Sequence, residues 1–356
     1  MAIFKDMLGS DETIFRNEIA LDYSYVPKVI PYREKEQKHI ALCIKPLLAG
    51  RNGRNLIVTG RPGVGKTVAC KHLFQELEEE TEEVIPIYVN CWNKNTSYKI
   101  MLEICNILGY KWVQNKKTEE LFEEIKKIIN KRSAVFAFDE IDKAEDYDFL
   151  YWLAEGIYKK SILLVTNYKE WVLELDERIK SRITAESLEF PEYNHAETEG
   201  ILRHRMEYAF LPNVVEQPAF NAIHSKTFEL RDIRAGLYML REAGNIAEDS
   251  SSRKVTLAHA EKAVQKISGF TVKNEEDLED ETRFILGLVK DNSGRRIGDI
   301  FKVYQEKGGV AGYKTFQRKV KKLDENKFIT MQKTIGGADG STSILKFEKE
   351  KKITDF

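Results

Sequence analysis

The segment from Gly60 to Thr67 limits the possible folds of this chain more than any other. It reads Gly-Arg-Pro-Gly-Val-Gly-Lys-Thr, the Gly-x-x-x-x-Gly-Lys-Thr pattern of a phosphate-binding loop. An apolar run over 55–59 precedes it and a helical pattern over 68–80 follows it. A glycine-rich turn before an ordinary helix is the alternative, but strand, loop and helix together favour a phosphate site. The sequence therefore predicts that the chain binds a nucleoside triphosphate.

Each part of this loop has a chemical task. Its glycines let backbone N–H groups curl around phosphates, and the following helix N-terminus adds partial positive charge. Lys66 supplies a point charge, and Thr67 supplies a hydroxyl for Mg²⁺. We therefore expect ATP or ADP with Mg²⁺ as cofactors. The predicted nucleotide-binding residues of the loop are Gly63, Val64, Gly65, Lys66, Thr67 and Val68.

Two adjacent carboxylates follow the apolar run 134–138. We expect Asp139 to hold Mg²⁺ together with Thr67, largely through water, and Glu140 to orient and deprotonate the attacking water. An Asp-Glu pair after an apolar run is often only a helix N-cap. The phosphate loop upstream favours the catalytic interpretation here.

Four further polar residues are candidates for the same chemistry. Asn167 ends the next apolar run, where its amide could bind the γ-phosphate or the attacking water; a strand-terminating turn is the alternative. Arg178 and Arg182, with Arg182 preferred, are candidate arginine fingers for a neighbouring subunit. A solvated basic helix end explains them equally well. Arg234 is a candidate second sensor of the nucleotide, and its alternative is a surface pair with Asp232.

The order of elements predicts the domain organisation. Apolar strands alternate with amphipathic helices over 55–189, which is typical of a parallel sheet with helices on both faces. The expected strands are 56–59, 84–89, 134–138, 162–166 and 187–190. The predicted domains are an ATP-binding base over 1–190, a helical lid over 191–272, an acidic linker over 273–281 and a winged helix over 282–356.

Charge is divided unevenly along the chain. The total net charge is −1, yet residues 281–356 hold 17 basic against 10 acidic side chains. Residues 1–280 hold 39 basic against 47 acidic side chains. A basic module on an acidic body indicates a polyanionic partner for the C-terminal part. No apolar run of about 18 residues is present, so we expect no membrane partner. The four cysteines lack Cys-x-x-Cys spacing, which favours free thiols in a reducing cytoplasm.

The C-terminal segment has the pattern of a winged helix. Its expected elements are a helix over 295–301, a turn over 308–312, a recognition helix over 313–323, and wing strands over 328–333 and 343–347. Phe316, Val320 and Leu323 fall on one helix face, which we expect to be core. Basic residues lie mostly on the other face, where a DNA backbone could lie. The alternative is a protein–protein module. The candidate DNA-binding residues are Lys314, Thr315, Arg318, Lys319 and Lys322, with Gly336 and Gly337 at the wing tip.

With these motifs in this order, the chain resembles the archaeal origin-recognition and cell-division-cycle initiator family of AAA+ ATPases over nearly its whole length. The segments that carry the resemblance are 17–34, 55–67, 89–96, 190–210 and 232–243. The resemblance implies an α/β fold: an AAA+ parallel αβα sandwich with an all-helical lid and a C-terminal winged-helix domain. The family usually has glycine where this chain has Arg231, and proline where it has Glu177 and Glu192.

The resemblance also implies roles for individual residues. Val26, Pro27 and Arg33 match the lead-in that borders the adenine, and Tyr193 and Arg205 match residues that contact the nucleotide. An initiator-specific insertion over 94–112 implies a second DNA contact, with Lys94 and Lys99 as candidates.

The implied function is an ATP-binding DNA replication initiator, cytoplasmic and associated with the nucleoid. It would recognise double-stranded origin DNA through the winged helix and the insertion. It would also help to load the replicative minichromosome maintenance helicase, with slow ATP hydrolysis as a switch. Other copies of the chain or paralogous initiators on DNA are further expected partners. Two alternatives stay open: a signalling ATPase whose winged helix serves protein contacts, and a helicase loader that binds single strands. The second predicts stacking aromatic residues, of which the basic surface has few.

Overall fold

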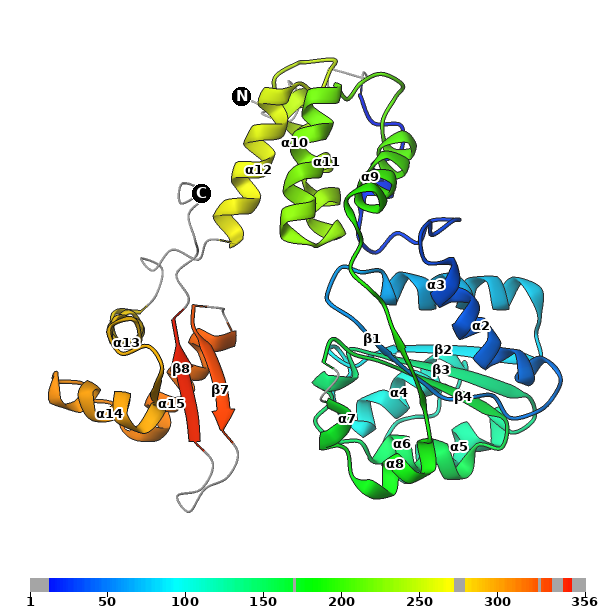
Figure 1. The fold of residues 1–356 in the computed structure, drawn as a ribbon. Helices are drawn as coiled ribbons and strands as arrows, with labels where there is room; N and C mark the ends of the chain where they lie inside the picture. The colour runs from blue at the N-terminus through cyan, green and yellow to red at the C-terminus, as the bar shows by residue number, and fades with distance from the viewer. Residues whose placement is uncertain (1–12, 169–170, 272–278, 326–327, 335–341, 348–356) are drawn as a thin grey trace, which may run out of the picture. The chain divides into compact units, whose positions relative to one another are not determined.

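Residues 13–168, 171–271, 279–325, 328–334 and 342–347 are described by the computed structural model. The chain divides into two compact units, Met1–Ile267 and Ser268–Phe356 (Figure 1). Among the described residues, no helix is long and apolar enough to cross a membrane. The four cysteines are free and buried.

The first unit is built on a parallel sheet of five strands in the order β2-β3-β4-β1-β5. All five predicted strands are confirmed. Their bounds are β1 (Leu56–Thr59), β2 (Val84–Asn90), β3 (Ser133–Asp139), β4 (Lys160–Val165) and β5 (Glu186–Glu189). Strands β3 and β4 are buried at every position, as expected for central strands covered on both faces.

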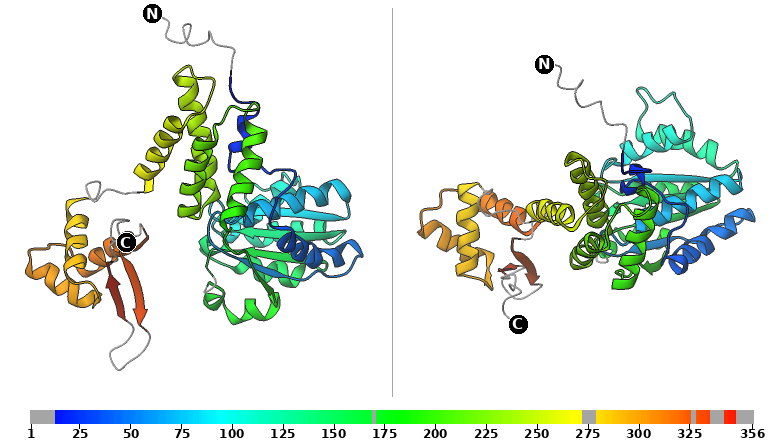
Figure 2. Two further views of the ribbon diagram at one scale, coloured as in Figure 1. Left: turned by 45° about the horizontal axis from the view of Figure 1, so that its top comes forward. Right: turned by 90° about the horizontal axis from the view of Figure 1, so that it is seen from above.

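Helices cover both faces of this sheet (Figures 1 and 2). One layer contains α2 (Glu34–Leu48) and α3 (Lys66–Glu80). The other contains α4 (Ser97–Ile107), α5 (Thr118–Ile129), α6 (Asp148–Gly156) and α8 (Glu177–Ile183), with the short η2 (Ile141–Lys143) and α7 (Trp171–Glu174) in its connections. Alternate residues of β3 serve the two layers: Val135 joins the cluster of α2 and α3, whereas Phe136 joins the cluster of α4, α5 and α6. The predicted αβα sandwich is confirmed.

The lid consists of α9 (His195–Ala209), α10 (Gln217–Leu230), α11 (Ile233–Asp249) and α12 (Leu257–Thr271). Helix α9 begins with a capping box, in which the Asn194 and Glu197 side chains each accept the other's backbone N–H. The N-terminal segment also packs here: Phe15 stacks on Phe210 with ring centroids 4.8 Å apart, and η1 (Glu18–Leu21) buries Leu21. Residues 14–21, which the sequence placed with the base, therefore belong to the lid core.

The second unit has the winged-helix arrangement. Its elements are α13 (Asp280–Asp291), β6 (Arg295–Arg296), α14 (Ile297–Glu306), α15 (Tyr313–Glu325), β7 (Thr330–Thr334) and β8 (Thr342–Lys346). The strands form an antiparallel sheet in the order β6-β8-β7. Two details differ from expectation. Arg295 and Arg296 pair with β8 instead of opening a helix, and α13 begins inside the predicted linker. Phe316, Val320 and Leu323 are fully buried, as predicted.

Candidate functional site: a nucleotide cleft between base and lid

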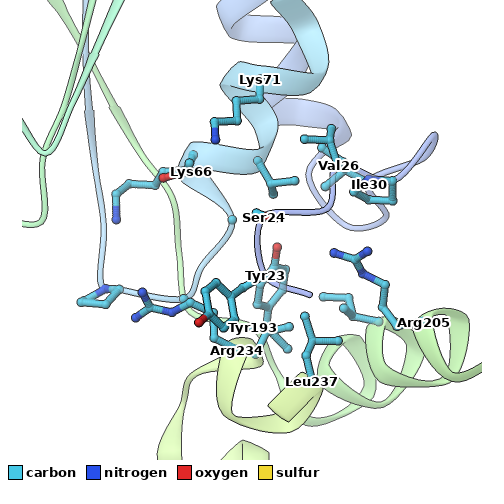
Figure 3. A pocket seen from close by; sticks show the side chains of 18 of the residues that line it. Tyr23, Ser24, Val26, Ile30, Lys66, Lys71, Tyr193, Arg205, Arg234 and Leu237 are labelled. Atoms are coloured by element: carbon cyan, nitrogen blue, oxygen red, sulfur yellow. The ribbon is translucent and has the colours of Figure 1, made fainter. Parts of the chain in front are cut away.

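A cavity of about 300 Å³ lies in the first unit, between the carboxyl edge of the sheet and the lid. Figure 3 shows Lys66 and Lys71 of the base on one side of it and Tyr193, Arg234 and Leu237 on the other. Most of the predicted ATP-site residues line this cavity. They are Val26, Pro27, Gly63, Gly65, Lys66, Thr67, Val68, Asp139, Glu140, Asn167, Tyr193, Arg205 and Arg234.

The phosphate loop needs glycine at two positions that the lid approaches. Gly63 has φ +81°, and a Cβ there would lie 2.2 Å from Oδ1 of Asp232. Gly65 has φ +93°, and a Cβ there would lie 2.7 Å from the Tyr193 hydroxyl. Both the positive φ and the close approach exclude side chains. The loop is thus a bare backbone cradle covered by lid residues, which fits a bound phosphate chain.

Lys66 points into this cradle and is nearly buried. Its Nζ donates to the carbonyl oxygens of Gly60 at 2.7 Å and Arg61 at 2.9 Å. It also donates to Oδ1 of Asn167 at 2.8 Å, so the predicted sensor amide and the loop lysine meet. Burial lowers the pKa of Lys66 to about 8, although the nearby Asp139 opposes this shift. An anionic phosphate beside Lys66 would stabilise its charged form.

The predicted magnesium residues lie together. Asp139 is 3% exposed, and its Oδ2 accepts the Thr67 hydroxyl at 2.6 Å and the Tyr88 hydroxyl at 2.7 Å. Its Oδ1 accepts the backbone N–H of Glu140 at 3.0 Å. Carboxylate and hydroxyl oxygens beside a phosphate cradle are the donors that Mg²⁺ prefers in nucleotide sites. The residues present therefore fit Mg²⁺, with Thr67 and Asp139 as the groups that would hold it.

Glu140 lines the cavity at the carboxyl edge of the sheet, and its backbone has an unusual conformation. Its φ and ψ are 53° and 42°, the left-handed region, which costs a non-glycine residue about 1–2 kcal/mol. Its Oε2 accepts Nδ2 of Asn90 at 3.4 Å. Strand pairing sets Asn90 opposite Asp139, which brings the amide to this carboxylate. Sequence reasoning gave Asn90 and Tyr88 no role in the site. The relevant signal was their place near the end of a strand, but it becomes informative only when β2 is known to neighbour β3.

The lid contributes Arg234, which also makes the pair with Asp232 that the sequence offered as the alternative to a sensor role. Asp232 caps α11 by accepting the backbone N–H of Arg234 at 2.9 Å. The same carboxylate binds the Arg234 side chain, with NH2 to Oδ2 at 2.7 Å. Arg234 therefore both lines the cavity, as a sensor must, and is paired with Asp232.

The side chains of Arg33 and Arg205 donate hydrogen bonds to backbone carbonyl oxygens. Arg33 is 2% exposed and lies outside the cavity lining. It donates to the carbonyls of Val64 at 3.0 Å and Pro191 at 2.6 Å, and its guanidinium lies 3.7 Å from the Tyr193 ring centroid. Arg33 thus ties the lead-in to the loop and the lid hinge, and its place beside the adenine stays a prediction. Arg205 reaches the cavity and also donates to the carbonyl of Ala20 at 3.0 Å.

The two finger candidates are exposed and each is paired with a carboxylate. Arg178 is 81% exposed and pairs with Asp176 at 3.1 Å, whereas Arg182 is 56% exposed and pairs with Glu155 at 2.6 Å. Neither lines the cavity. A role toward a neighbouring subunit stays a prediction for both.

The DNA candidates differ in how free they are. Lys314 and Arg318 are exposed on α15, and Thr315 is half-buried. Lys319 is only 15% exposed and pairs with Glu279 at 2.8 Å and Glu281 at 3.2 Å, so a DNA contact would require it to leave two carboxylates. The Lys322 side chain and both wing glycines, Gly336 and Gly337, lie outside the described residues.

Lys94 and Lys99, the candidate DNA contacts of the insertion over 94–112, also have side-chain partners. Lys94 pairs with Glu103 at 3.0 Å, and Lys99 donates to Oδ1 of Asn95 at 2.8 Å. Both contacts are on the surface, where they contribute little stability and can exchange for a phosphate.

A parallel sheet with a phosphate loop, a carboxylate pair at the next strand end and a helical lid over the cavity defines a AAA+ ATPase. The model of the AAA domain matches residues 50–165, and that of the Cdc6 AAA+ ATPase-type lid domain matches 199–265. ORC1-type DNA replication protein 2 of Methanothermobacter thermautotrophicus is 30% identical over 97% of this chain and 96% of its own length. ORC1-type DNA replication protein 1 of Archaeoglobus fulgidus is 29% identical over 99% and 92%. The chain belongs to the ORC1-type DNA replication protein family.

Solved structures agree with this assignment. The Aeropyrum pernix ORC1 protein, solved in complex with DNA, matches with a TM-score of 0.73 and 25% identity, covering 96% of this chain and 95% of that one. The Aeropyrum pernix ORC2 protein, in ADPNP–ADP complexes, shares the fold with a TM-score of 0.66 at 20% identity. The family resemblance and the fold inferred from the sequence are confirmed.

Proposed function

We propose that this chain is an ATP-dependent initiator of DNA replication that binds origin duplex and helps to load the replicative minichromosome maintenance helicase. The observation that carries the proposal is the extent of the family match. Relatives named as DNA replication proteins align with 97–99% of the chain, so both the ATPase unit and the winged helix are included.

The ATP step uses the residues gathered at the sheet edge. Mg²⁺ supplies charge neutralisation for the phosphates when it is bound. Lys66 and the loop N–H groups bind the phosphate chain, and Asn167 lies close enough to Lys66 to orient it. Glu140 accepts the proton of the attacking water, and Asn90 holds its carboxylate. Slow hydrolysis is supported by the ion pair of Arg234 with Asp232, because Arg234 must exchange this carboxylate for phosphate before it can act as a sensor.

Bound nucleotide would set the position of the lid relative to the base. Tyr193, Arg205 and Arg234 come from the lid or its hinge, while Lys66 and Asp139 come from the base, and all line one cavity. A ligand that touches both parts favours the closed arrangement by its differential affinity.

DNA binding is assigned to α15. Lys314 and Arg318 are exposed on this helix, whose opposite face is core. A helix with one buried and one basic face suits the major groove, with phosphate contacts that set its register. The similarity to the Aeropyrum pernix ORC1 protein, solved in complex with DNA, supports DNA as the partner.

The test is fluorescence anisotropy of the full chain with labelled origin and random duplexes, in ATP and in ADP. We expect origin preference in ATP, and weaker binding by the Lys314→Ala/Arg318→Ala double variant. Lys45→Ala, an exposed lysine on α2, is the matched control and should bind as the native chain does.

Two outcomes would contradict the proposal. If the chain bound no duplex with either ATP or ADP, the result would favour a signalling ATPase whose winged helix serves protein contacts. Tighter binding to single strands than to duplex would favour a helicase loader.

A further inference from the structure

Tyr88 contacts the carboxylate that the magnesium site depends on. Its hydroxyl donates to Oδ2 of Asp139 at 2.7 Å, and the same oxygen accepts the Thr67 hydroxyl at 2.6 Å. With the backbone N–H of Glu140 at 3.0 Å from Oδ1, three donors hold the two carboxylate oxygens. The orientation of Asp139 is therefore set by its neighbours before any ligand arrives.

The Tyr88 ring is itself held in place. Strand β2 is an edge strand, and Tyr88 faces α3 from it, packed against the buried cluster of α2 and α3. Nζ of Lys71 lies 4.8 Å from the ring centroid, a cation–π contact. These contacts fix the hydroxyl at the point where Asp139 ends the next strand.

The two hydroxyls that bind Oδ2 differ in one respect. Thr67 lines the cavity and is a candidate ligand of Mg²⁺, so its bond to Asp139 depends on what the cavity holds. Tyr88 is not among the lining residues and reaches Asp139 from outside the cavity. Its bond to Asp139 therefore involves no atom of the cavity lining other than Asp139 itself.

We propose that Tyr88 is a positioning residue, which holds Asp139 in the orientation that receives Mg²⁺ with ATP. The inference rests on the Mg²⁺–ATP binding proposed above. Hydrogen-bond partners behind a metal ligand typically contribute about 10–100-fold to metal affinity. Since Asp139 keeps two other donors, we expect the lower end of that range.

The experiment compares the full chain with its Tyr88→Phe variant, which keeps the ring against α3 and removes only the hydroxyl. Binding of a fluorescent ATP analogue is titrated with Mg²⁺ and repeated in EDTA. We expect the half-saturating Mg²⁺ concentration to rise about tenfold, with affinity in EDTA unchanged. Electron paramagnetic resonance of bound Mn²⁺ should show the same loss of metal affinity. Tyr158→Phe, at a tyrosine that is 70% exposed, is the matched control.

The outcomes separate this inference from the proposed function. Failure of the native chain to bind the ATP analogue would overturn the proposed function. An unchanged Mg²⁺ dependence in Tyr88→Phe would overturn the positioning role alone. An equal loss of affinity with Mg²⁺ and in EDTA would show a structural role instead. In an Asp139→Ala background, Tyr88→Phe should have no further effect on the Mg²⁺ dependence, because the carboxylate that Tyr88 positions is already gone.

Discussion

The Glu192 carboxylate binds the Arg231 guanidinium, with Oε2 at 2.8 Å from NH1. The resemblance seen in the sequence marks both residues as departures from the family's pattern, and here they meet in one ion pair. The other oxygen of Glu192 binds NH1 of Arg61 in the phosphate loop at 2.7 Å. Loop, hinge and lid are thus linked by one carboxylate. The three side chains are 35–59% exposed, so each pair contributes about 0.2–1 kcal/mol or less.

Arg231 should be more tolerant of glycine than of alanine. It ends α10 in the left-handed region, with φ 53° and ψ 31°. Arg231→Ala removes the ion pair and keeps the backbone strain, whereas Arg231→Gly removes both. We expect the free energy of unfolding of the glycine variant to exceed that of the alanine variant by about 1 kcal/mol. Urea denaturation measures it. Equal stabilities would mean that the backbone at Arg231 is unstrained.

Gly63→Ala should prevent the lid from closing on the phosphate loop. The new methyl group would lie 2.2 Å from Oδ1 of Asp232, at a φ of +81° that alanine avoids. We expect ATP affinity, measured by calorimetry, to fall at least about tenfold, since 1.4 kcal/mol of misfit suffices. Gly287→Ala is the control, because it has open space around it and lies within α13. A Gly63→Ala variant with native affinity would contradict the closed contact.

ATP affinity should fall as the pH rises above 8. The pKa of Lys66 in the free protein is lowered to about 8 by burial, so the amine loses its proton above that pH. A bound phosphate favours the charged amine, and binding must then take up a proton. Linkage predicts a decrease approaching tenfold per pH unit, absent below about pH 7.

This pH dependence is measured in EDTA, so that no metal contributes. Lys66→Arg should remove it, because arginine keeps its charge across this range. A native affinity that is constant from pH 7 to 10 would show that Lys66 stays protonated.

Two neighbouring cations of α15 should differ in DNA binding. Arg318 is exposed, whereas Lys319 is held by Glu279 and Glu281. Arg318→Ala should reduce the slope of log K against log salt by about 0.9, the value of one phosphate contact. Lys319→Ala should leave the slope unchanged and lower the stability of the winged helix slightly. Equal slope changes for both variants would mean that DNA displaces the two glutamates.

Much of this molecule is readable from local pattern. The central strands are continuous apolar runs, and the phosphate loop carries its function within eight consecutive residues, Gly60 to Thr67. Asp139 and Asn167 meet Thr67 and Lys66 of the loop because parallel strands bring their carboxyl ends to one edge. The lid and the winged helix followed from their order along the chain.

The rest depends on contacts that no local pattern encodes. Tyr88 and Asn90 gain their partners only because β2 pairs with β3. Arg33 bonds to carbonyl oxygens, which every residue carries, so sequence cannot tell a backbone tie from a nucleotide contact. Phe15 packs on Phe210, far along the chain, through a short apolar segment without periodicity.

The N-terminal segment in the lid core has a mechanical consequence. Because residues 14–21 pack with the lid while α2 belongs to the base, the chain crosses between the two parts there and again after β5. Arg33, at the first crossing, donates to the carbonyl of Pro191 at the second, at 2.6 Å. A body tied at one point can swivel in any direction, but one tied at two neighbouring points turns chiefly about the line between them. Nucleotide binding and release would then change chiefly one angle, the rotation of the lid relative to the base about that line.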